Sequence, residues 1–149
     1  MPMLECPGVF TMPLVPEGWT ATAENNLTFF ELQPTSKDAA VHISVYHRPE
    51  PAALEPGQAE GYLRQFVNRT PTKGEPKLVV LPPKGEEQRA FAKYRNRDNN
   101  GRVSEWFAGC ILWRSTMLMC SCNAAPGNPR LQEGERMIAS IFQGTENNS

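Results

Sequence analysis

The residues best suited to acid–base or metal chemistry in this 149-residue chain are its two histidines, His42 and His47. Both fall in stretch 40–47, where apolar and polar residues alternate as in a β-strand. Side chains five positions apart on a strand point to opposite faces. The two imidazoles therefore cannot jointly bind a metal ion or form an acid–base pair. No serine or cysteine lies beside either histidine in a nucleophile pattern, which leaves only an arrangement formed in space.

Four cysteines are the other candidate ligands or nucleophiles: Cys6, Cys110, Cys120 and Cys122. The pair Cys120-Ser-Cys122 has the wrong spacing for a zinc knuckle, and both side chains fall on one face of a strand. Free cysteine behaves as a small apolar side chain. We expect Cys110, Cys120 and Cys122 to be buried thiols, with metal binding as the alternative.

Charged residues offer no stronger signal, because 15 basic residues balance 16 acidic ones. Glu86-Glu87 is most simply a solvated pair at the start of a strand. A locally basic stretch lacks the interleaved aromatic residues that would stack on bases, so we interpret it as a solvated strand face. Its members are Lys73, Lys77, Lys84, Arg89, Lys93, Arg95 and Arg97. With no glycine-rich phosphate loop either, we expect no enzyme, no cofactor and no metal site.

A β-hairpin at 102–123 forms the centre of the expected fold. Two apolar runs are separated by the polar break Arg114-Ser115. Trp106, Ala108, Cys110 and Leu112 would point to one face, and Phe107, Ile111 and Trp113 to the other. A strand that is apolar on both faces must be covered on both.

Two helices are predicted from apolar residues at helical spacing. The first follows Pro56, and its stripe is Ala59, Tyr62, Leu63, Phe66 and Val67. The second begins at Asn128-Pro129 and ends near Gly144, and its stripe is Leu131, Gly134, Ile138, Ile141 and Phe142.

Short strands complete an α+β fold with a mainly antiparallel sheet of about six or seven strands. Besides the hairpin, they are expected at 9–14, 27–32, 40–47, 77–81 and 87–97. We predict a single domain over 1–144, a polar tail over 145–149, and both helices packed on one face. The other face would need a partner, and Met117 and Met119 on the last strand suit one because methionine adapts to irregular apolar surfaces.

The N-terminus lacks the charged and apolar regions of a signal peptide, and no apolar run reaches the ~18 residues of a membrane span. We therefore expect a cytoplasmic protein.

The order and spacing of several features resemble the Mog1/PsbP-like fold. An opening strand leads into Val15-Pro16-Glu17-Gly18-Trp19, followed by Phe30-Glu31-Leu32 and the helix with Tyr62. Further along are Tyr94 before the Gly101-Arg102 turn, the Trp113-Arg114 break, the strand from Met117 and the Ala125-Pro126 turn. Within that fold the chain is similar to the DUF1795 group, which includes chaperones encoded beside Rhs-type effectors of bacterial type VI secretion.

This resemblance implies a small cytoplasmic homodimer that shields an apolar, transmembrane-like segment of an effector. The implied apolar contacts fall on Leu27 and Phe29, and an implied polar contact on the first helix falls on Gln65. A second implied polar contact falls on Ala108, which together with Cys110 would complete the cradle.

Other functions remain open at this point. An immunity or inhibitor protein would bind a folded toxin domain through a polar surface and keep its apolar face packed in its own dimer. A small-ligand carrier or a regulator of a GTPase is compatible with the fold alone.

Overall fold

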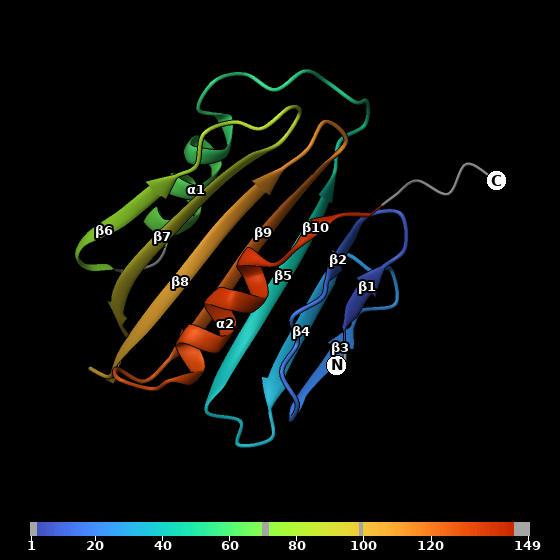
Figure 1. Ribbon diagram of the computed structural model, residues 1–149. Helices are drawn as coiled ribbons and strands as arrows, with labels where there is room; N and C mark the ends of the chain where they lie inside the picture. The colour runs from blue at the N-terminus through green and yellow to red at the C-terminus, as the bar shows by residue number, and fades with distance from the viewer. Residues whose placement is uncertain (1–2, 70–71, 99, 145–149) are drawn as a thin grey trace.

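The computed structural model of the chain describes residues 3–69, 72–98 and 100–144 (Figure 1). The predicted polar tail, 145–149, lies outside these residues. In chain order the elements are β1 Leu4–Cys6, β2 Phe10–Met12, β3 Trp19–Ala23, β4 Phe29–Pro34, β5 Ala39–His47, α1 Gln58–Asn68, β6 Thr72–Val80, β7 Gln88–Arg97, β8 Val103–Leu112, β9 Thr116–Ala124, α2 Arg130–Ala139 and β10 Phe142–Gln143.

A seven-stranded antiparallel sheet in the order β3-β4-β5-β9-β8-β7-β6 confirms the predicted α+β class. The β8–β9 hairpin lies inside the sheet, as its apolar sequence predicted. Its turn is closed by the amide of Trp113, which donates to the carbonyl of Thr116 at 2.8 Å. β7 pairs with β8 along its whole length, and β5 pairs with β9, so the hairpin is hydrogen-bonded on both sides.

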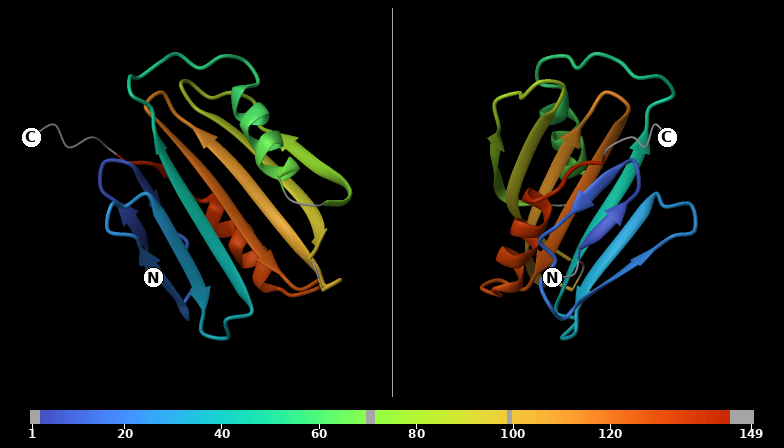
Figure 2. Two further views of the ribbon diagram at one scale, coloured as in Figure 1. Left: turned by 180° about the vertical axis from the view of Figure 1, so that it is seen from behind. Right: turned by 45° about the vertical axis from the view of Figure 1, so that its right-hand side comes forward.

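The two helices lie on opposite faces of this sheet, so the prediction that both pack on one face is wrong (Figures 1 and 2). Phe107 and Ile111 of β8 belong to the core that includes Ile138 of α2. Ala108 and Cys110, alternating with them, belong to the core that includes Leu63 of α1. Because both sides of the hairpin are apolar, each helix covers one side instead of the two sharing one.

The second helix approaches the sheet through Gly134. A Cβ placed on Gly134 would lie 2.8 Å from the Cβ of Cys122 in β9, and closer still to its Sγ. Only a residue without a side chain lets the helix backbone pack this tightly on the strand. The helix itself is shorter than predicted and ends at Ala139, after which Phe142 enters β10.

The N-terminal strands differ most from the prediction. Instead of one strand over 9–14, β1 and β2 form a small sheet with β10 that packs beside α2. Phe10 of β2 meets Phe30 of the main sheet edge to face, with ring centroids 5.3 Å apart. Trp19 begins the edge strand β3 and is buried.

Candidate functional site

Half of one sheet face is not covered by a helix. On its side of the sheet α1 lies over β6, β7 and β8, while β3, β4, β5 and β9 have no described element over them (Figure 2). We call this surface the open face. Its side chains, assigned from strand register, are Thr20, Thr22, Phe29, Glu31, Gln33, Ala40, His42, Ser44, Tyr46, Met117, Met119, Ser121 and Asn123.

An aromatic and ionisable cluster lies on β4 and β5 of the open face. Glu31 and His42 are directly opposite each other in register, and His42 Nε2 lies 2.7 Å from Glu31 Oε2. The ring of Phe29 stacks on the imidazole with centroids 5.6 Å apart. All three side chains are partly exposed. They therefore present an apolar ring and a hydrogen-bonded pair that a partner can contact together.

Larger apolar side chains lie beside this cluster, on β5 and β9. Tyr46, on β5, is 51% exposed, whereas Met119 on β9 is almost fully buried. Met117 is partly buried and packs against the core beneath α1, as does Trp106 of β8. The open face thus combines adaptable apolar groups near α1 with polar groups on β4 and β5.

The residues predicted as a binding site are divided by the structure. Phe29 is on the open face, but Leu27 lies in the β3–β4 turn with a positive φ of 55° and is 45% exposed. Gln65 is exposed on α1. Ala108 and Cys110 have no exposed surface because α1 covers them. Of the five, only Phe29 is an accessible side chain of the open face in this structure.

Two features of the open face went unrecognised in the sequence. The contact between Glu31 and His42 depends on the register between β4 and β5, which the sequence of either strand does not predict. Tyr46 is exposed because α1 packs on β6, β7 and β8 and does not cover β5. A signal was present, because His42, Ser44 and Tyr46 share the polar side of their strand.

The cysteine side chains are buried and free, which confirms the packing prediction for Cys110, Cys120 and Cys122. Burial raises the pKa of Cys110 and of Cys122 to about 12. Burial also raises the pKa of Cys120. At neutral pH these groups are therefore thiols, not the thiolates that act as nucleophiles and metal ligands.

Metal-site geometry is absent from the part of the chain that the structure describes, where no three His, Cys, Asp or Glu side chains cluster suitably. Within the same residues, no helix has the length and apolar character needed to cross a membrane.

Comparison with known proteins identifies the fold. No family model and no curated protein matches the chain. Among solved structures, cyanobacterial PsbP (CyanoP) from Synechocystis sp. PCC 6803 is similar with a TM-score of 0.65 and 13% identity, covering 91% of this chain and 87% of that one. The Saccharomyces cerevisiae Ran-binding protein Mog1p gives a TM-score of 0.61 and 11% identity, covering 97% and 95%.

A structure from Bacteroides thetaiotaomicron VPI-5482 gives a TM-score of 0.62 and 16% identity over 98% of this chain. The chain spans about half of that protein, covering 49% of it. Together these similarities show that the chain has the Mog1/PsbP-like fold.

Proposed function

We propose that this chain is a non-catalytic adaptor that binds an apolar segment of a partner protein on its open face. The observation that carries the proposal is the uncovered half of the sheet on the side of α1 (Figure 2). When another element packs on an uncovered sheet face, the accessible aromatic side chains are removed from water, and this burial stabilises the complex. Complete burial of one such side chain contributes roughly 1.5–3 kcal/mol.

The polar groups on β4 and β5 narrow the class of partner. A partner that covered Glu31 and His42 with apolar atoms alone would leave Ser44 and the outer carboxylate oxygen without hydrogen bonds. The best fit is an amphipathic segment whose apolar side packs on Phe29 and Tyr46 and whose small polar groups meet Glu31.

The resemblance to effector-associated chaperones supports a secreted effector as the partner and a cytoplasmic homodimer as the working form. Mog1p, described as a Ran-binding protein, supports the use of this fold in protein recognition. An effector segment that is apolar enough to insert into membranes would be kept soluble by burial on the open face.

The test is co-expression with a tagged Ala/Gly-rich apolar peptide that carries serines along one side, followed by pull-down and light scattering. Phe29→Asp and Tyr46→Ser should reduce capture, because both remove apolar surface from the open face. Val79→Asp is the matched control, since Val79 is an exposed apolar residue on the distant edge strand β6.

Thermal unfolding of each variant separates loss of binding from loss of folding. Equal capture by wild type and by folded Phe29→Asp and Tyr46→Ser would contradict the proposal. Capture of a folded, charged toxin domain in place of the apolar peptide would favour the immunity function instead.

A further inference from the structure

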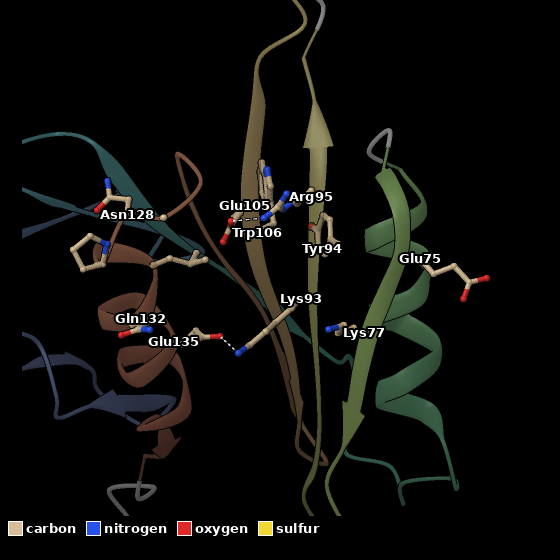
Figure 3. A pocket seen from close by; sticks show the side chains of 13 residues that line it. Glu75, Lys77, Lys93, Tyr94, Arg95, Glu105, Trp106, Asn128, Gln132 and Glu135 are labelled. Atoms are coloured by element: carbon tan, nitrogen blue, oxygen red, sulfur yellow. Dashed lines mark hydrogen bonds and ion pairs between the residues drawn. The ribbon is translucent and has the colours of Figure 1, made fainter.

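A charged groove lies on the opposite side of the sheet from the open face. It is a cavity of about 550 Å³ between α2 and strands β6, β7 and β8 (Figure 3). Its strand wall carries Lys77, Lys93 and Arg95, and its other wall carries Glu135 of α2. The groove is not part of the open face, so binding there is independent of the proposed function.

The strand wall contains two lysines in direct opposition. Lys77 of β6 and Lys93 of β7 are cross-strand partners in register. Like charges placed directly opposite each other destabilise a sheet unless an anion lies between or beside them. Lys93 has such an anion, because its Nζ lies 2.8 Å from Glu135 Oε1. Among the described residues Lys77 has no ion-pair partner.

The accessible charges of the groove are mainly positive. The side chains of Lys93 and Arg95 are 62% and 57% exposed, whereas their partners Glu135 and Glu105 are only 21% and 26% exposed. Glu75, the third carboxylate of the lining, points away from α2 (Figure 3). An incoming ligand therefore meets cations first, while the two deeper carboxylates hold those cations in place.

We propose that this groove binds an extended acidic segment of a protein partner, with carboxylates at alternate positions. Lys93 and Arg95 are two residues apart on one strand, which spaces them by about 6.6–6.8 Å. Alternate side chains of an extended peptide have the same spacing. Lys77, opposite Lys93, supplies the charge that no carboxylate of the described residues already neutralises.

Other anions fit the groove less well. A free phosphate is much smaller than the cavity and would not span from Lys77 to Arg95. Single-stranded nucleic acid binds through bases stacked on aromatic rings, but the rings of Tyr94 and Trp106 belong to the core beneath α1, on the other side of the sheet.

The experiment uses the full chain and a fluorescein-labelled peptide of alternating Glu and Ala, measured by fluorescence anisotropy. A peptide of alternating Gln and Ala, inorganic phosphate and a single-stranded DNA oligonucleotide are the comparison ligands. Lys77→Gln should weaken binding of the acidic peptide about two- to fivefold, the range of one exposed ion pair. Glu135→Gln should strengthen binding, because it releases Lys93 for the ligand.

An ion pair on α1 supplies the matched controls. Arg64 and Glu60 form an exposed pair on the other side of the sheet, so Arg64→Gln and Glu60→Gln change net charge without touching the groove. Amide chemical shifts should change in β7 and α2 when the acidic peptide is added. If Arg64→Gln weakens binding as much as Lys77→Gln, if those amide shifts stay unchanged, or if phosphate or DNA binds more tightly than the acidic peptide, the proposal is wrong.

Discussion

The indole Nε1 of Trp113 donates a hydrogen bond of 2.8 Å to the carboxylate of Glu87. Arg89 donates two more to the same carboxylate, each at 3.0 Å, and also bonds the carbonyl of Ile141 just after α2. This carboxylate therefore ties the end of the central hairpin to β7 and, through Arg89, to the end of α2. Glu87, expected to be a solvated residue, is a structural link.

The link predicts that the protein loses stability in acid. Burial alone would raise the pKa of Glu87, but the hydrogen bonds from Arg89 and Trp113 outweigh it and hold the pKa below its ordinary value of 4.5. A carboxyl with a lowered folded-state pKa stabilises the fold above its unfolded-state pKa, and this stabilisation is lost as pH falls through the folded-state pKa. Urea unfolding at a series of pH values from 7 to below 4 measures the effect.

Replacement of the carboxylate tests the same link at neutral pH. Glu87→Gln should lower the free energy of unfolding by about 1.5–3 kcal/mol, the range for hydrogen bonds to a charged group. It should also flatten the acid dependence below about pH 5, where the unfolded-state carboxyl begins to bind a proton. Glu86→Gln is the control, since that side chain is 71% exposed, and should change stability little. Equal effects of the two substitutions would contradict the structural role of Glu87.

Because α2 packs closely on β9, we expect Gly134→Ala to destabilise the protein although alanine has a higher helix propensity than glycine. Gly134→Ala places a Cβ against Cys122, and Val41 Cγ2 lies only 3.3 Å away, so the helix must shift. We expect a loss of about 1–3 kcal/mol from overpacking. Gly61→Ala on α1 meets nothing within 4 Å and should instead stabilise the protein by up to about 1 kcal/mol. Thermal unfolding of both variants shows whether packing or helix propensity determines the change in stability at each position.

Features that depend on a local sequence pattern could be predicted from the sequence. The alternation through 103–112 correctly assigned Phe107 and Ala108 to opposite faces of a central strand. Features that depend on how elements distant in the sequence pack together could not be predicted. The side on which each helix packs, and the Glu31–His42 pair, follow from strand register and helix placement, which no single stretch encodes.

A substitution at Leu27 distinguishes the binding site that the family resemblance implies from the open face. Its positive φ of 55° is unfavourable for a leucine, and asparagine adopts that conformation more readily. Leu27→Asn should therefore leave the melting temperature unchanged or raise it. If the open face is the site, this variant should also capture the apolar peptide as wild type does. Loss of capture by a stable Leu27→Asn protein would place the β3–β4 turn in the binding site.

Thiol reactivity tests how rigidly α1 covers the sheet. Cys110 lies beneath α1 with no exposed surface, whereas Cys120 and Cys122 lie beneath α2. Burial raises the pKa of all three thiols, so the folded protein should react with a thiol reagent only through opening motions. With Cys6→Ser as the background, native and urea-unfolded samples compare the rates. If Cys110 alone reacts quickly in the native protein, α1 moves away from the sheet, and the accessible surface then extends from the open face to Ala108, as the family resemblance implied. If all three react only on unfolding, that part of the sheet is permanent core and partner binding is restricted to β3, β4, β5 and β9.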